Sequence, residues 1–269
     1  MHAATLAAPY TQDFQSFAAN ASLPDEIIGG TGTVTTNTWS TVVSGGNTYY
    51  QNNLVGTSAK GLDSLQFSNL GPALAANTGF KVSVQMLPPG TITAGTNVTQ
   101  GVRFLAATTN TVNDAYAVDF NIGSTNPGRM RLIEWSGATP TIYPDLAQAN
   151  QPLVPNFDIL KAYQLDVVGM YDSLSRLLIT ATVTEVGAPA NTATSTFTTG
   201  ANISSPDASP RTGSYFGFYT SFSGAATEVT NFDNFSVTLV PEPASLTLLG
   251  LAAIGLCTRR SRMAGHSTR

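Results

Sequence analysis

The stretch FKVSVQM at residues 80–86 decides the fold. Apolar residues stand at every second position from Phe80 to Met86, and Lys, Ser and Gln stand between them. Successive side chains of a β-strand point to opposite faces, so this alternation predicts a strand with one buried and one wettable face. Such strands are typical of antiparallel sheets that pack face to face.

The same alternation recurs along most of the chain, with clusters of Gly, Pro, Asn and Ser between the runs. In the run 116–122 it predicts that Asp119 and Asn121 face solvent. Helical periodicity is nearly absent, since only residues 144–149 suit one short turn of helix. About a dozen strands predict an all-β fold, an antiparallel two-sheet jelly-roll sandwich. The strongest runs are 80–86, 116–122, 163–169, 177–186, 215–222 and 235–239, and residues 90–100, 108–114, 123–129 and 187–212 are predicted to be loops.

Three regions follow from this pattern. Residues 1–9 form a leader, residues 10–239 one jelly-roll domain and residues 240–269 a tail. Two small sandwiches joined near residues 150–155 are the alternative, but jelly-roll sheets interleave strands from both halves of a chain, which favours one domain. The Ala-rich leader resembles the end of a signal peptide, so we expect the true export signal upstream of Met1; a short unstructured leader is the alternative.

Charge is scarce and unevenly placed. Charged residues make up 10% of the chain, against roughly 25% in an average soluble protein. Residues 1–240 carry 8 Lys and Arg and 15 Asp and Glu, a net charge of −7, whereas residues 241–269 carry 4 Arg and one Glu, a net charge of +3. Because phosphate binding needs a basic surface, the acidic body argues against nucleic acid as a partner.

The side chains that most often carry catalysis are missing from the predicted domain. The only histidines are His2 and His266, and the only cysteine is Cys257 in the tail. A Ser-His-Asp triad, a His-based zinc site and a thiol nucleophile are therefore excluded from residues 10–239. These absences favour a protein that is not an enzyme.

Paired carboxylates are the remaining route to glycan cleavage, which needs two acids about 5–10 Å apart. Asp166 with Asp172, or Asp114 with Asp119, are the candidate pairs. We expect these four residues to be separate, solvated members of strand faces.

Aromatic residues beside polar ones suggest a softer function, carbohydrate binding. Sugar sites stack rings on aromatic side chains and fix hydroxyls with a few polar groups. One candidate group is Trp135 with Tyr143 and Asp145, and a second is Trp39 with Tyr49. Packing in the core is the alternative role for both tryptophans.

A structural Ca²⁺ ion is a further candidate, because carboxylate and carbonyl oxygens at the ends of the first and last strands suit this cation. Asp13 precedes the first apolar run, and Asp233 and Asn234 precede the last strand. A solvated turn is the alternative interpretation of these residues.

The tail combines three features in a fixed order. Pro241-Glu242-Pro243 stops the preceding structure, an uncharged run extends from Ala244 to Cys257, and Arg259, Arg260 and Arg262 follow. This order resembles the PEP-CTERM sorting signal, which implies export, transient anchoring in the inner membrane and processing by an exosortase-type peptidase. The apolar run is shorter than the roughly 20 residues of a full membrane span; an ordinary C-terminal anchor or an interfacial helix is the alternative.

The body more weakly resembles the concanavalin A-like and laminin-G-like jelly rolls, through Gly32–Trp39, Tyr163–Val186, Gly217-Phe-Tyr219 and Asn231-Phe-Asp-Asn-Phe-Ser236. We therefore expect an exported protein of the cell surface or extracellular matrix, without catalytic activity and associated with polysaccharide. The alternatives are a glycan-active hydrolase or lyase on the same scaffold, and a structural or adhesive protein with no specific ligand.

Overall fold

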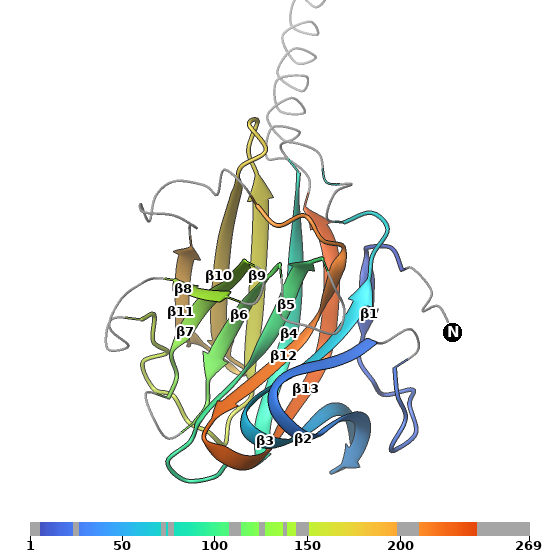
Figure 1. Cartoon of the computed structure of the whole chain (residues 1–269), viewed down its shortest axis with the longest axis vertical. Helices are drawn as coiled ribbons and strands as arrows, with labels where there is room; N and C mark the ends of the chain where they lie inside the picture. The colour runs from blue at the N-terminus through green and yellow to red at the C-terminus, as the bar shows by residue number, and fades with distance from the viewer. Residues whose placement is uncertain are drawn as a thin grey trace, which may run out of the picture.

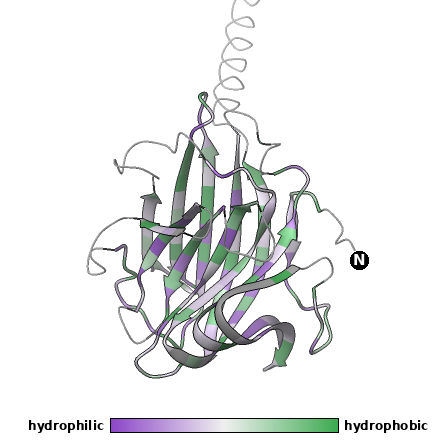
Figure 2. Ribbon diagram, viewed as in Figure 1, coloured by the Kyte–Doolittle hydropathy of each residue, from purple (hydrophilic) through white to green (hydrophobic). Residues whose placement is uncertain are grey.

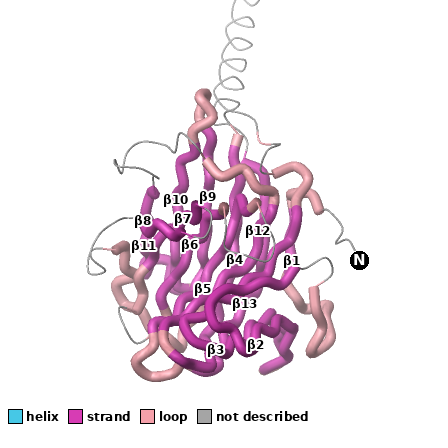
Figure 3. The backbone as a smooth tube through the Cα atoms, in the orientation of Figure 1, coloured by secondary structure: helices cyan, strands magenta, loops and turns pink. Residues whose placement is uncertain are grey.

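The computed structural model describes residues 6–23, 27–70, 74, 78–107, 114–123, 127–136, 139–143, 151–197 and 210–240. These residues form strands, turns and loops and contain no α-helix (Figure 3). Within the same ranges, no helix offers the length and hydrophobicity that a membrane crossing requires. The all-β prediction is confirmed, whereas the predicted helical turn at 144–149 and the predicted helix of the tail lie outside the described residues.

Thirteen strands form one antiparallel sheet with the order β11-β10-β9-β4-β13-β3-β12-β5-β6-β7-β8, in which β1 also pairs with β13 and β2 with β3. The strands are β1 (Tyr10–Gln12), β2 (Ile27–Ser44), β3 (Asn47–Gln66), β4 (Gly79–Thr91), β5 (Asn97–Ala106), β6 (Ala115–Asn121), β7 (Met130–Ser136), β8 (Thr139–Tyr143), β9 (Tyr163–Tyr171), β10 (Leu177–Glu185), β11 (Ala188–Phe197), β12 (Tyr215–Ser223) and β13 (Ala225–Val240).

This sheet curls until its two halves face each other, as the crossing of β9 and β4 behind β5 and β6 shows (Figure 1). Ring contacts join strands that are far apart in the sheet order. Phe80 on β4 lies 5.5 Å from Phe104 on β5, and Phe120 on β6 lies 5.2 Å from Tyr163 on β9. The curled sheet is therefore an antiparallel β-sandwich of the jelly-roll type, with a common core between its layers.

The first and last parts of the chain are interleaved in this sheet. β13 lies between β4 and β3, and β12 lies between β3 and β5. A division of the described strands into an N-terminal and a C-terminal sandwich would break hydrogen-bonded pairs.

The main core contains the residues that the alternation assigned to it. Phe80, Val82, Val84 and Met86 are each 0% exposed. Hydrophobic and hydrophilic positions alternate along the central strands (Figure 2). Burying side chains of this size stabilises the fold by about 1.5–3 kcal/mol each, before conformational entropy is subtracted.

Two stretches that the sequence predicted to be loops contain strand residues: β5 begins at Asn97, inside the predicted loop 90–100, and β11 is the larger difference. Residues 187–212 were expected to be a loop, but β11 occupies Ala188–Phe197 and pairs with β10. Its inward side chains include Ala193 and Phe197, and threonines alternate with them. The hydrophobic pattern is weak because β11 lies at the edge of the sheet, where small residues suffice to cover the core.

Candidate functional site

A row of side chains crosses the face of the sheet that points away from the main core. Directly opposed residues of neighbouring strands share one face of a sheet. The apolar members of this face form a small hydrophobic cluster, separate from the main core, that includes Leu62, Tyr219, Ile133 and Trp135. From β3 through β12, β5 and β6 to β7, the row consists of Leu62, Tyr219, Gly101, Asp119 and Arg131.

Two more cations extend this row. Lys60 stands two residues from the row on β3, opposite Ser221, and Arg103 stands two residues from the row on β5, opposite Gly217. Because strand side chains alternate, both lie on the face of the row. We call the surface formed by Lys60, Arg103, Asp119, Arg131 and Tyr219 the polar face.

Asp119 and Arg131 form a bidentate ion pair at the centre of β6 and β7. Arg131 Nε donates to Asp119 Oδ1 at 2.8 Å, and Arg131 Nη2 donates to Asp119 Oδ2 at 2.9 Å. The Asp119 side chain is 1% exposed and that of Arg131 is 17% exposed. The carboxylate of Asp119 is the largest influence on Arg131 and raises the pKa of the guanidinium. Of the two side chains, only that of the arginine reaches solvent.

The prediction that Asp119 and Asn121 face solvent is therefore wrong. Asp119 is 0% exposed and Asn121 is 9% exposed. The alternation correctly separated the two faces of β6, but the second face is covered as well. Asp119 meets Arg131, and Asn121 Nδ2 donates to Asn97 Oδ1 at 2.5 Å, so both buried polar groups have partners.

The phenol of Tyr219 is a neutral hydrogen-bonding group. Burial, together with the nearby charge of Asp119, raises the pKa of Tyr219 well above its ordinary value, and its hydroxyl is hydrogen-bonded with Ser221. Burial, and then the positive charge of Arg131, lowers the pKa of the Lys60 ammonium group, so its charged form is less favoured than in water. The positive charges of Lys60 and Arg131 therefore repel each other across the row.

Glycines bring the strands of the polar face close together. A Cβ atom at Gly101 would lie 2.0 Å from the Val118 carbonyl oxygen, and one at Gly217 would lie 2.0 Å from the Asp63 carbonyl oxygen. No side chain fits at either position, and both glycines are buried, so they allow the neighbouring strands to pack closely. Across Gly217, Arg103 Nη1 donates to Ser64 Oγ at 3.1 Å.

Arg103 is a second unusual cation in this region. The residue is 0% exposed, and burial lowers the pKa of its guanidinium to about 10. A guanidinium remains protonated at neutral pH even so. Perturbed, clustered titratable groups are typical of functional sites, although structural ion pairs produce them too.

The predicted carbohydrate residues are only partly brought together. Trp135 lies on the face of the small cluster and contacts Tyr219, with ring centroids 5.6 Å apart, but it is 1% exposed. Tyr143 ends β8, and Asp145 lies outside the described residues. Trp39 is 3% exposed in the main core, stacked on Tyr50 at 5.5 Å, so core packing accounts for it. Tyr49 is half-buried on β3.

The residues that were predicted to bind Ca²⁺ lie side by side. β1 pairs with β13, so Asp13 follows the end of β1 next to Asp233 and Asn234. A cavity of about 330 Å³ is lined there by Thr11, Gln12, Asp13, Asn234, Phe235 and Ser236. Burial and then the nearby charge of Asp13 raise the pKa of Asp233, against a hydrogen bond from the Asn234 amide. The described residues contain no group of three acidic, His or Cys ligands, so a bound Ca²⁺ remains a prediction.

The predicted carboxylate pairs meet cations in this structure. A carboxylate bound to its own cation is less available to act on a substrate, because its oxygens are already engaged in the ion pair. Besides Asp119 with Arg131, the pairs are Asp166 with Lys81 at 3.1 Å, Asp172 with Arg176 at 2.7 Å and Asp114 with Arg211 at 3.6 Å.

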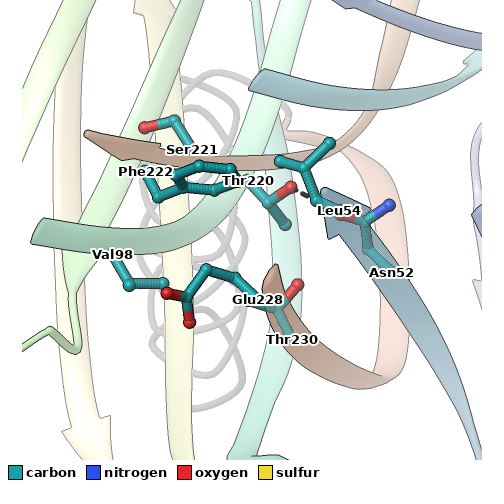
Figure 4. A pocket seen from close by; sticks show the side chains of 8 residues that line it. All are labelled: Asn52, Leu54, Val98, Thr220, Ser221, Phe222, Glu228 and Thr230. Atoms are coloured by element: carbon teal, nitrogen blue, oxygen red, sulfur yellow. Dashed lines mark hydrogen bonds between the residues drawn. The ribbon is translucent and has the colours of Figure 1, made fainter. Parts of the chain in front are cut away.

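A second polar cluster lies inside the sandwich, around Glu228 (Figure 4). Glu228 is 2% exposed and accepts hydrogen bonds from Thr93 N at 3.1 Å and Thr96 Oγ1 at 3.1 Å. Burial raises its pKa. The surrounding empty space, about 150 Å³, admits no water-sized sphere, so this cluster fastens the loop before β5 and has no room for a ligand.

Reasoning from sequence did not identify Lys60, Arg103, Arg131 or Tyr219 as site residues. One local signal was available, because residues 123–128 read GSTNPG, a turn between two apolar runs. A hairpin around that turn places Asp119 opposite Arg131. Asp119 and Arg131 share a face with Lys60 and Tyr219 only because of the strand order, which the sequence does not reveal.

Comparisons with known proteins identify the tail and leave the body unassigned. Residues 239–261 match the family model of the PEP-CTERM protein-sorting motif, which indicates an exported protein. No curated protein sequence matches the chain.

Solved structures with a similar chain path include an alginate lyase from Aplysia kurodai (10% identity, 76% of this chain and 87% of that chain, TM-score 0.42). Peanut lectin is another (15% identity, 87% and 99%, TM-score 0.41). A third is the CBM2 module of the evolved Dit protein of Lactobacillus casei BL23 phage J-1 (10% identity, 87% and 96%, TM-score 0.45). Likeness at these scores has no bearing on ligand or activity.

Proposed function

We propose that this chain is an exported, non-catalytic protein whose β-sandwich associates with polysaccharide through the polar face. The sorting motif supports delivery through a transient inner-membrane stage, with processing by an exosortase-type peptidase and release to the cell surface or matrix. The observation that carries the proposal is the gathering of Lys60, Arg131 and Tyr219 on one face of the sheet.

This face carries groups that suit sugar hydroxyls and ring oxygens. Carbohydrate is recognised by a few fixed donors and acceptors beside apolar or aromatic surface. Arg131 and Ser221 remain partly exposed, and the Thr99 and Ser221 hydroxyls lie 2.8 Å apart on the next row. Trp135 and Tyr219 are each 1% exposed and pack against each other on the same face, so they support these groups from within the protein.

The binding proposal is tested with the full chain in mild detergent. Its retention is measured on gels and columns that carry neutral and acidic polysaccharides. We expect retention on at least one polysaccharide, and substitution of Arg131 together with Ser221 by Ala should weaken it. Absence of retention on every polysaccharide, including the host's own matrix, would overturn the proposal and favour a structural protein with no specific ligand.

Sorting is tested separately in an exosortase-containing host. Replacement of Pro241, Glu242 and Pro243 by Ala should prevent processing, so that the uncleaved protein stays in the membrane fraction. The matched control replaces Thr247, which lies in the apolar run, by Ala. Normal release of the triple variant would contradict the proposed processing.

A glycan-cleaving enzyme is the second candidate, and the clustering of Tyr219 with Arg131 and Asp119 favours it. In a β-elimination, a base removes the proton at C5 of a uronate, the C5–C4 pair forms a double bond, and the bond from C4 to the leaving oxygen breaks with proton transfer to that oxygen. A cation stabilises the carboxylate while negative charge develops. The buried, neutral Tyr219 is poorly suited as the base, since a base must reach the substrate proton.

The two candidates differ in their products. Incubation with alginate or polygalacturonate yields unsaturated, ultraviolet-absorbing ends from a lyase, and new reducing ends from either a lyase or a hydrolase. We expect neither product from this chain. Release of unsaturated ends that disappears in Tyr219→Phe would establish the enzyme instead.

A further inference from the structure

The cations of the acidic body are not evenly spread. Residues 1–240 have a net charge of −7. Among the described residues, most other cations on the sandwich have a carboxylate partner, such as Lys81 with Asp166 and Arg176 with Asp172. The polar face instead places Lys60 on the same face as Arg131, whose carboxylate partner is Asp119.

The carboxylate of Asp119 is bound by Arg131 and forms no ion pair with Lys60. Both of its oxygens accept hydrogen bonds from the Arg131 guanidinium. The charge that acts on Lys60 is the positive charge of Arg131, which, after burial, contributes to the lowered pKa of the ammonium group. A cation that is partly desolvated and faces another cation gains stability when an anion binds between them.

Both cations also keep donors that a ligand at the surface can reach. Arg131 has further N–H donors besides those bound to Asp119, because a guanidinium carries five. Lys60 and Arg131 are both partly exposed, whereas Asp119 below them is not, so a ligand meets the cations first.

We propose that the polar face selects an acidic polysaccharide, with a sugar-borne anionic group held between Lys60 and Arg131. This inference rests on the proposed polysaccharide function and adds the class of ligand. A uronate carboxylate and a sulfate ester share the required chemistry, a charge-assisted acceptor for ammonium and guanidinium donors. The positive pair lies in a body of net charge −7, so it offers polyanions a local attraction that the net charge of the body does not.

The test compares polymers that differ only in charge. Full-length protein in mild detergent is titrated with polygalacturonate and with its methyl ester, and with dextran sulfate and dextran. We expect the acidic member of at least one pair to bind at least about tenfold more tightly than its neutral counterpart, and to weaken as salt is added. The pair that shows the preference distinguishes carboxylate from sulfate.

Matched lysine variants locate the effect. Lys60→Met should reduce the affinity for the acidic polymer by about tenfold, the effect of one charge-assisted contact, and leave any affinity for the neutral polymer unchanged. Lys81→Met is the control, because Lys81 is 40% exposed on β4 and pairs with Asp166. The Tm of Lys60→Met should equal or exceed that of the wild type, since a partly buried cation beside another cation is removed.

The outcomes separate the two proposals. Equal affinity for the acidic and neutral polymers, or a Lys60→Met variant that binds like the wild type, overturns the acidic-ligand inference and leaves polysaccharide binding intact. Failure to bind any of the four polymers or the host's matrix overturns both. Preference for the acidic polymer that is lost in Lys60→Met but kept in Lys81→Met supports both.

Discussion

Replacing Arg131 by Met tests the central feature of the polar face, the ion pair with Asp119. Met retains much of the apolar stem of Arg131 but donates no hydrogen bond. The variant leaves a carboxylate that is 0% exposed without its guanidinium, after the loss of contacts at 2.8 Å and 2.9 Å. Removing one partner of a buried ion pair costs about 3–5 kcal/mol, because the other charge stays desolvated.

The lower end of that range applies here, since the Arg131 side chain is 17% exposed and water can approach the vacated position. A loss of about 3 kcal/mol lowers the Tm of a domain of roughly 200 residues by about 6–12 °C. The double variant Asp119→Asn/Arg131→Met removes both charges of this pair, so its Tm should recover part of the loss. Thermal unfolding followed by circular dichroism provides all of these values.

The control is Arg176→Met on the turn between β9 and β10. Arg176 also pairs with an aspartate, Asp172, at 2.7 Å, but this pair lies at the surface. Exposed ion pairs contribute little, so its Tm should stay close to that of the wild type. If Arg131→Met is as mild as Arg176→Met, or if the double variant is less stable than the single one, the reasoning about burial is wrong.

Three further predictions follow from the same structure. Gly101→Ala should destabilise the protein by about 1–3 kcal/mol, because its Cβ would lie 2.0 Å from the Val118 carbonyl oxygen and force β5 and β6 apart; an unchanged denaturant midpoint would contradict this. Glu228 has a raised pKa in the folded protein, so the folded state keeps this proton to higher pH than the unfolded chain does. The contribution of Glu228 to stability therefore declines as pH rises above the ordinary value of 4.5. The difference in Tm between Glu228→Gln and wild type should change as pH rises above that value, and a constant difference would argue against the shift. Millimolar Ca²⁺ should raise the Tm if Asp13 and Asp233 hold this cation, and the Asp13→Asn/Asp233→Asn variant should lose the response; equal responses of both proteins would assign the effect to another site.

Local sequence was sufficient for the architecture. The alternation in 80–86 predicted a strand with Phe80, Val82 and Val84 in the core, and all three are 0% exposed. The reason is physical, because side-chain direction in a strand follows from position alone, with a period of two residues. β11 was missed because it lies at the sheet edge and carries few large apolar residues, so the two-residue period is hard to see in its sequence.

The sorting signal of the protein also consists of contiguous residues. The PEP-CTERM motif spans 239–261, and its breaker, apolar run and arginines are adjacent in the sequence. The absence of histidine and cysteine from residues 10–239 likewise required no structure, and it excludes several catalytic classes.

The polar face, in contrast, was decided by tertiary structure. Lys60, Asp119, Arg131 and Tyr219 come from β3, β6, β7 and β12, and the order of these strands brings them onto one face. A period of two residues shows that Asp119 and Phe120 point in opposite directions, but it does not show what covers each face. Burial and charge pairing depend on long-range strand order and sheet curvature, so the candidate binding surface emerged only when the sheet was folded.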